Sequence, residues 1–194
     1  MTVEIYCPET TVGADLLDRF HEVQLWPGED EALYEDMRQE MKYDFSPDGA
    51  YEKSLVEKMI QLEWDTRRLR RMRDTVLMGA FKLQAASAYM MFATKMEDVL
   101  GMDPEASQFA RDLVHPDPKR HGPARKTLAK MELTELELAT QAYLAIPEQL
   151  EPLESRIAEA EVRQRRPLND LFNLRAQYAK IVFTNDEDDG DLKW

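Results

Sequence analysis

Residues 50–100 decide the fold, and they read AYEKSLVEKMIQLEWDTRRLRRMRDTVLMGAFKLQAASAYMMFATKMEDVL. This stretch contains no proline and a single glycine, Gly79, so no residue in it forces a helix to stop. A helix of this length would extend for about 75 Å at 1.5 Å per residue. Positions spaced alternately by four and three residues form a seam along it: Leu55, Met59, Leu62, Thr66, Leu69, Arg73, Val76, Ala80, Leu83, Ser87, Met90 and Thr94. Such a heptad seam predicts a long helix packed lengthwise against another helix.

A second seam follows Pro147, at Leu150, Leu153, Ile157, Ala160, Gln164, Pro167, Leu171, Leu174, Tyr178 and Ile181. Two seamed helices in one chain pair most simply with each other. The sequence therefore predicts an all-α fold, an elongated helical bundle built on a long antiparallel coiled-coil-like hairpin. Pro167 lacks an amide donor and clashes one turn back, so we expect it to kink or split the second helix.

Shorter elements are expected on either side of these helices. Helices are predicted at 14–23, 30–42, 103–114 and 124–145, and a turn at 45–49. The run HPDPKRHGP at 115–123 contains three prolines and is expected to be an exposed loop. We expect an irregular arm over 1–25, a single helical domain over 26–183, and an acidic disordered tail over 184–194.

The negative net charge of the chain disfavours some classes of partner. The 194 residues include 25 Lys and Arg against 38 Asp and Glu, a net charge of -13, and residues 1–50 alone hold 13 acids and 3 bases. Such an acidic chain is repelled by nucleic acid and by anionic lipid, so blanket nucleic-acid binding is disfavoured. The lone Cys7, the lack of a long apolar run and an N-terminus without signal-peptide features predict a cytoplasmic protein with no membrane contact.

An arginine-rich run, RRLRRMR, occupies residues 67–73. At about 100° per residue, four of its arginines fall within about 160° of the helix circumference, opposite the apolar seam. They are Arg67, Arg68, Arg70 and Arg71. Two interpretations remain open: the arginines bind phosphates through bidentate contacts, or they neutralise acids of the same chain. The net charge favours the second.

The acidic partners in that second interpretation are close in the sequence. Glu63 lies one turn before Arg67, and an acidic helix with Glu31, Glu35, Asp36 and Glu40 lies just upstream. Ile60 and Trp64 share the arginine face. We therefore expect that acidic helix to pack on this face through Leu33, Met37 and Met41.

Two further stretches are candidates for a partner surface. The distal half of the first long helix is apolar on several sides, which indicates either core packing or a surface for self-association or a partner, with Met90, Met91 and Phe92 as the candidate surface. The apolar residues of this half are Met78, Tyr89, Met90, Met91, Phe92 and Met96. The chain ends in NDEDDGDLKW, an acidic run followed by Leu192 and Trp194. This segment is either a solvated end or a short linear motif whose acids steer Trp194 to a basic partner.

No pattern of residues indicates catalysis. His115, Asp117 and His121 can ligate metals, but they lie in a Pro-rich run without a Cys partner or a His-x-x-x-His spacing. The chain also lacks a Gly-rich phosphate loop and a G-x-S-x-G elbow. We therefore expect no catalytic residues, no metal and no cofactor, and a protein that is not an enzyme.

The order of motifs over residues 26–78 has a parallel elsewhere. An acidic helix with Tyr34-Glu35 and the turn Phe45-Ser46-Pro47 precede a helix with Leu55-Val56-Glu57, Trp64 and Arg67-Arg68-Leu69-Arg70-Arg71. This order resembles a set of short bacterial proteins of uncharacterised function, with a fainter echo at 158–174. The resemblance implies a helical bacterial protein and supplies no activity, cofactor or site residue.

The sequence thus favours a non-enzymatic helical interaction or scaffold protein, a subunit of a larger bacterial assembly. A protein partner or self-association is expected. The alternative is an accessory nucleic-acid-binding protein of a mobile or phage-like element, which would grip phosphates through the four arginines.

Overall fold

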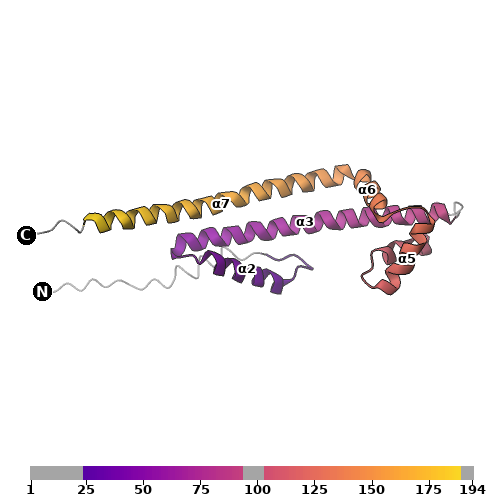
Figure 1. The fold of residues 1–194 in the computed structure, drawn as a ribbon, viewed down its shortest axis with the longest axis horizontal. Helices are drawn as coiled ribbons and strands as arrows, with labels where there is room; N and C mark the ends of the chain where they lie inside the picture. Colours follow the sequence, from indigo (N-terminus) through magenta and orange to yellow (C-terminus); the bar gives the residue numbers. More distant parts are fainter. Residues whose placement is uncertain (1–23, 94–102, 189–194) are drawn as a thin grey trace, which may run out of the picture. The chain divides into compact units, whose positions relative to one another are not determined.

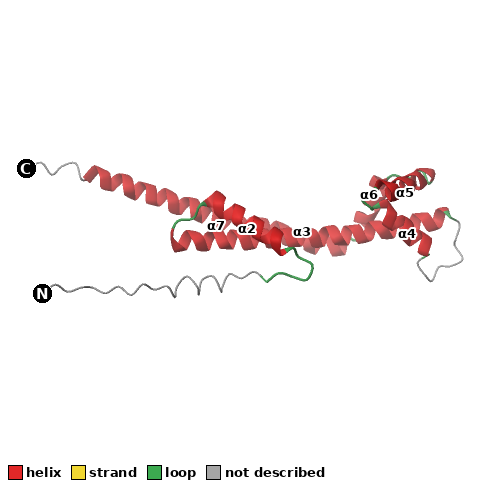
Figure 2. Ribbon diagram, turned by 90° about the horizontal axis from the view of Figure 1, so that it is seen from below, coloured by secondary structure: helices red, strands yellow, loops and turns green. Residues whose placement is uncertain are grey.

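The computed structural model describes residues 24–93 and 103–188, with side chains as far as residue 180. These residues contain six helices and no strand, which confirms the predicted all-α class (Figures 1 and 2). The helices are α2 (Glu31–Phe45), α3 (Gly49–Phe92), α4 (Pro104–Leu113), α5 (Pro118–Lys130), α6 (Glu135–Ala145) and α7 (Pro147–Asp188). The helix predicted at 14–23, the last residues of the first long helix and the end of the tail lie outside the described residues.

The chain packs as two compact units. Unit 1 comprises Met1–Thr66 and Ala160–Trp194, and unit 2 comprises Arg67–Glu159. The long helices α3 and α7 each contribute residues to both units.

Capping residues that can be recognised in the sequence determine where α2 begins and ends. The Asp30 carboxylate caps the helix by accepting the amide protons of Ala32 and Leu33, at 3.0 and 3.2 Å. The helix ends where Ser46 adopts a left-handed conformation, with φ at 38°. Gly49 begins α3 with φ at 75°, a value that glycine adopts without steric conflict. The predicted turn at 45–49 is therefore confirmed.

The core of unit 1 forms where α2 and α7 meet the first part of α3. It contains Tyr34 and Met37 of α2, Leu55, Val56, Ile60 and Trp64 of α3, and Leu171 of α7. The Trp64 ring is completely buried and meets Tyr34 edge-on, with ring centroids 5.2 Å apart. Its indole N–H donates to Glu29 Oε2 at 3.2 Å.

The predicted packing of α2 on this face of α3 is confirmed, with one correction. Met37 is buried and Met41 packs against the same cluster, but Leu33 is exposed. Tyr34 takes the buried position instead. The reason is tertiary, because the Tyr34 ring packs edge-on against the buried Trp64 ring of α3.

Within unit 1 the two long helices run in opposite directions. Glu52 of α3 pairs with Arg175 of α7, and Thr66, further along α3, meets the earlier residue Gln164 at 3.1 Å. The seam positions Leu55, Met59 and Thr66 are buried here, as expected. Unit 1 therefore contains an antiparallel helix pair.

The predicted splitting of the second long helix at Pro167 is wrong. The helix α7 runs from Pro147 to Asp188, and the Pro167 side chain is buried within it. Proline removes one backbone hydrogen bond. Packing of the apolar face on both sides of the proline supplies most of a helix's stability and so keeps α7 continuous.

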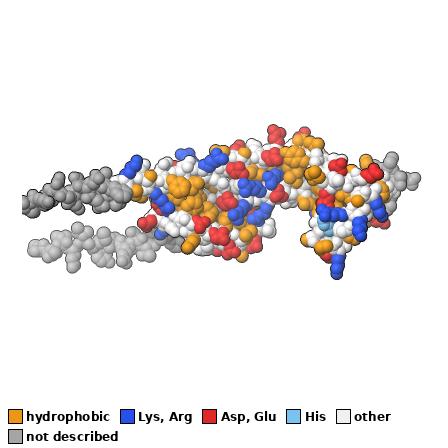
Figure 3. Space-filling model, viewed as in Figure 1, with side chains coloured by type: hydrophobic (Ala, Val, Ile, Leu, Met, Phe, Trp, Pro, Cys, Tyr) orange, Lys and Arg blue, Asp and Glu red, His pale blue; other side chains and the backbone are white. Residues whose placement is uncertain are grey.

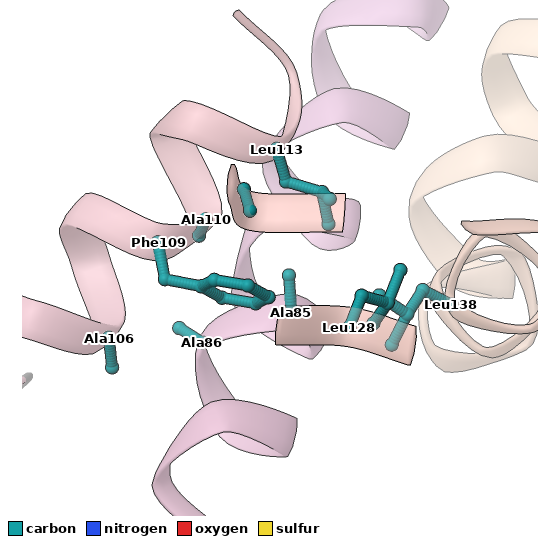
Figure 4. Packing of buried hydrophobic residues seen from close by; sticks show 9 residues of the cluster. Ala85, Ala86, Ala106, Phe109, Ala110, Leu113, Leu128 and Leu138 are labelled. Atoms are coloured by element: carbon teal, nitrogen blue, oxygen red, sulfur yellow. The ribbon is translucent and has the colours of Figure 1, made fainter. Parts of the chain in front are cut away.

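The core of unit 2 forms where three short helices pack on the second part of α3. Phe109 of α4 lies against Ala85 and Ala86 of α3, whose small side chains allow the close approach (Figure 4). Its ring stacks on Tyr89 with centroids 5.0 Å apart. The rest of this cluster consists of Ala106, Ala110, Leu113, Ala124, Leu128 and Leu138.

The first seam does not continue as the buried stripe of unit 2. Leu83 belongs to the predicted seam but is 52% exposed, whereas Ala85 and Ala86 are buried. The reason is tertiary, because α4 contacts a face of α3 that the heptad count does not select.

Residues 115–145 depart most from prediction. The run 115–123 is not a loop throughout, because α5 begins at Pro118, where the Asp117 carboxylate caps the helix by accepting the Lys119 amide at 2.9 Å. Pro123 is exposed and tolerated inside α5 because the buried Ala124 and Leu128 hold this helix on the core of unit 2.

The predicted helix at 124–145 is also wrong in extent, because it is divided into the end of α5 and α6. Glu132 adopts a left-handed conformation with φ at 57°. Thr134 and Glu137 then form a capping box that starts α6.

Substituting the buried tryptophan tests the core of unit 1. We expect Trp64→Ala to lower the free energy of unfolding by about 3–5 kcal/mol, because a large cavity replaces a fully buried ring. The matched control is Trp26→Ala, which removes a half-exposed ring and should change it by less than about 1 kcal/mol. Urea unfolding followed by circular dichroism measures both. Equal losses in the two variants would contradict this account of the core.

The Glu52–Arg175 pair gives unit 1 a pH dependence. Glu52 is 4% exposed and accepts from Arg175 Nη2 at 2.7 Å and from the Asp48 amide at 3.0 Å. The hydrogen bonds from Arg175, and then from the Asp48 amide, hold the pKa of Glu52 below its usual value. A carboxyl group with a lowered pKa in the folded state stabilises the fold above its unfolded pKa, and this contribution is lost as the pH falls through the folded value.

We therefore expect Glu52→Gln to make the free energy of unfolding depend less on pH between about pH 5 and pH 3. Glu40→Gln, at an exposed position on α2, should follow the wild-type profile. Chemical unfolding at a series of pH values measures the slope. A Glu52→Gln variant with the wild-type slope would show that this carboxyl group does not couple to folding.

Candidate functional site

An open apolar hollow of about 440 Å³ lies between α3 and α6 in unit 2. The α3 side contributes Asp74, Leu77, Met78 and Phe81, and the α6 side contributes Ala139, Ala142 and Tyr143. Among these residues, Asp74 carries the only charge.

A second hollow of about 740 Å³ shares Met78, Phe81 and Ala139 with the first. It extends along 113–116 to His121, Glu135 and Leu136. Because the two hollows share three residues, we treat them together as the α3–α6 groove. Its dimensions lie in the range of sites that hold a ligand or a bulky side chain.

The groove forms where the short helices no longer cover the stripe of α3 that contains Asp74, Met78, Phe81 and Ala85. Asp74, Met78 and Phe81 follow helical spacing, and the next member of that stripe, Ala85, is completely buried in the core of unit 2. Phe81 packs partly against this core, whereas Met78 is 43% exposed. The same stripe therefore passes from a buried core into an open groove.

The helix α6 presents apolar side chains on more than one side. Leu138 and Ala142 are buried, and they fix the helix against the core. Leu136 and Leu144 of the same helix are 75% and 70% exposed, but only Leu136 lines the groove. Hydrophobic side chains gather over α6 and the start of α7 in Figure 3. Contiguous exposed apolar surface of this kind marks interaction sites.

A polar network borders the groove. His121 Nε2 lies 3.2 Å from Glu135 Oε1, and Arg125 Nη2 donates to Glu135 Oε2 at 3.0 Å. The hydrogen bond from Arg125 lowers the pKa of Glu135, so this carboxyl group is held in its charged form. Asp112 and Arg120 form a further ion pair that joins α4 to α5. These pairs connect the three short helices at one end of the groove.

The helix α5 is basic throughout. It carries Lys119, Arg120, Arg125, Lys126 and Lys130 and no acidic residue, and all five of these residues are exposed. Blue and pale-blue side chains over α5 are visible in Figure 3. Residues 67–159 contain 14 basic and 14 acidic residues, so unit 2 is neutral and unit 1 carries the whole net charge of -13.

The four predicted arginines lie along α3. Arg67 and Arg68 are partly buried, and Arg70 and Arg71 are exposed. Each of the four has an interaction with another group of the chain. The structure does not place them at the groove.

The predicted apolar surface at the end of α3 is partly buried in the core and partly exposed. Met90 packs against the core of unit 2, whereas Met91 is 78% exposed and Phe92 is half-exposed. None of these three residues lines the α3–α6 groove. The predicted tail residues Leu192 and Trp194 lie outside the described residues.

The groove was not predicted as a site, although Met78 belonged to the predicted apolar half of the first long helix, and His115 and His121 to the candidate metal ligands. Leu136 and Tyr143 were expected on a single helix over 124–145, so the start of α6 was not recognised. The capping box at Thr134 and Glu137 was the signal that could have revealed α6. The Asp117-Pro118 pair could likewise have revealed the basic helix α5.

Among the residues that the structure describes, no group of three or more His, Cys, Asp and Glu side chains is arranged to hold a metal ion. In the same part of the chain, no helix combines the length and apolar character that crossing a bilayer requires. No family model matches the chain, and neither curated proteins nor solved structures give a match. The resemblance to short bacterial proteins therefore stays a prediction.

Proposed function

We propose that this chain is a non-enzymatic interaction protein that binds a protein partner through the α3–α6 groove. The exposed apolar lining of the groove is the observation that carries the proposal. Covering such a surface lowers the free energy of the complex in water by about 25 cal/mol for each Å² of apolar area removed from water. A partner that inserts apolar side chains between α3 and α6 would obtain this stabilisation.

The composition of the groove fits a protein partner. Aromatic residues and methionine are typical of the centre of protein interfaces, and charged residues of their rim. Here Met78, Phe81 and Tyr143 lie in the lining, and the Glu135 network lies at one end. The groove therefore has the anatomy of an interface centre with a polar border.

The two long helices supply the scaffold for this surface. We propose that the antiparallel pairing in unit 1 continues as a hairpin along α3 and α7, because both helices contribute to both units. In this proposal the protein is a cytoplasmic subunit of a larger bacterial assembly, and unit 2 presents the binding surface.

Nucleic-acid binding through the arginine face is the competing function. The interactions that Arg67, Arg68, Arg70 and Arg71 already make, together with the net charge of -13, favour the protein-binding proposal. The competing function requires retention on DNA or RNA that weakens steeply with salt and is lost when the four arginines are replaced by alanine.

A matched pair of substitutions on α6 tests the groove. Leu136→Asp places a charge in the groove, and Leu144→Asp places the same charge on the same helix outside it. Because both side chains are exposed, both variants should fold with wild-type circular dichroism. We expect Leu136→Asp to reduce the amount of partner recovered with the tagged chain by about tenfold or more, and Leu144→Asp to leave recovery unchanged.

Affinity purification from the cells that produce the protein, followed by quantitative mass spectrometry, measures this recovery. Partner recovery that is equal for the two variants would contradict a binding role for the groove. Loss of recovery in both variants would show that exposed apolar surface in general, and not the groove, holds the partner.

A further inference from the structure

The chemistry of the partner follows from the groove together with the basic helix α5 beside it. The groove borders α5 at His121, and α5 carries five Lys and Arg residues without an acidic residue. A partner that uses both features must combine a large apolar side chain with a run of acidic residues. The chain itself contains such a segment, in which Asp186, Glu187, Asp188, Asp189 and Asp191 precede Trp194.

We infer that the α3–α6 groove binds the C-terminal segment of a second copy of this chain, with Trp194 in the groove and the acidic run along α5. This inference rests on the proposed function, because it names the partner of the same groove. The chain would then assemble with itself through a surface of unit 2 and the end of α7.

Charge complementarity supports this occupant. The segment 185–194 carries five acids and one base, and α5 carries five exposed bases and no acid. Two of those bases are paired with neighbours, Arg120 with Asp112 and Arg125 with Glu135. Lys119, Lys126 and Lys130 are exposed on the other side of α5. Attraction between the two segments speeds encounter and opposes wrong partners.

The dimensions of the two segments agree. Asp186, Glu187 and Asp188 end the helix α7, and the six residues from there to Trp194 span at most about 21 Å of extended chain. The 13 residues of α5 extend for about 20 Å. With the Trp194 ring in the hollow beside His121, the acidic run therefore covers a distance similar to the length of α5.

The length of α7 favours a second copy as the source of the segment, because Trp194 stays remote from the residue at which α7 leaves unit 2. The helix rises about 42 Å between Ala160 and Asp188, both in unit 1. The six residues that follow Asp188 span at most about 21 Å. Trp194 therefore stays at least about 21 Å from Ala160, the first residue of α7 in unit 1.

A contact between a tail and a groove is heterologous, because the two surfaces differ. Such contacts close when two chains exchange tails or when several form a ring, and otherwise continue as an open chain. The expected species are therefore dimers or larger assemblies whose share grows with protein concentration.

Sedimentation velocity of the full chain over a range of concentrations tests the inference. We expect wild-type protein to self-associate, and Trp194→Ala and Leu136→Asp each to weaken self-association by about tenfold or more. Trp26→Ala and Leu144→Asp are the controls, a second tryptophan and a second exposed leucine of α6, and both should associate like the wild type. Wild-type association of the Trp194→Ala variant would overturn the inference.

A charge exchange tests the pairing of the acidic run with α5. Reversing three bases (Lys119→Glu, Lys126→Glu, Lys130→Glu) or three acids (Asp186→Lys, Glu187→Lys, Asp189→Lys) should weaken self-association and reduce its dependence on salt. Combining both sets in one chain should restore association. A combined variant as weak as either single set would show that the two segments do not pair.

The failure of this inference is distinguishable from failure of the proposed function. A synthetic peptide of residues 184–194 serves as the probe. If the wild type stays monomeric and only the Trp194→Ala chain binds the peptide, the tail occupies the groove of its own chain, and the second-copy assignment is wrong. If Leu136→Asp still removes a cellular partner while Trp194→Ala changes nothing, the groove binds another protein. If neither substitution affects any association, both proposals fail.

Discussion

A helix with apolar side chains on several sides cannot bury them all against one neighbour, and α3, with 44 residues, is such a helix. In unit 1 two helices bury these side chains, because α2 and α7 pack on different sides of the first part of α3. Trp64, Ile60 and Val56 are completely buried there. The pair of the buried Glu52 and the partly exposed Arg175 joins α7 to the start of α3, and Arg175 also donates to the Phe45 carbonyl at 2.6 Å.

In unit 2 short helices cover α3 instead, and they leave more of its apolar side chains exposed. Small side chains at positions 85 and 86 allow α4 to approach α3 closely, so Phe109 fills the space between them. Towards the N-terminus of α3 this cover ends, and Met78 is left open beside α6. The groove is thus a consequence of covering a long helix with short ones. The capped starts of α5 and α6 place a basic helix and an exposed leucine at its edge.

Much of the secondary structure could be predicted from local signals in the sequence. The absence of proline over 50–100 indicated α3, and Asp103-Pro104 indicated the start of α4. The same Asp-Pro signal at 117–118 was outweighed by the other prolines of that run, although the buried Ala124 and Leu128 show that tertiary packing stabilises α5. Local sequence signals fail in such cases because packing against a neighbouring helix supplies the stability that the segment does not have on its own.

The groove could not be predicted from periodicity. Met59 and Leu83 belong to the same heptad seam, yet Met59 is buried in unit 1 and Leu83 is exposed in unit 2. Nothing in a repeat of seven residues tells which stretch of a helix a neighbour covers. That information lies in the caps at 117–118 and 134–137, which determine where the short helices begin.

Hydroxyl-radical footprinting of the methionines tests the central claim, that one stripe of α3 is open in the groove. In dilute protein, Met78 and Met91 should be oxidised readily, and the buried Met37 and Met59 slowly. When the groove is occupied, oxidation of Met78 should fall while that of Met91 stays constant. Protection of Met78 equal to that of Met37 in the dilute protein, or protection of Met91 alone on association, would contradict the account.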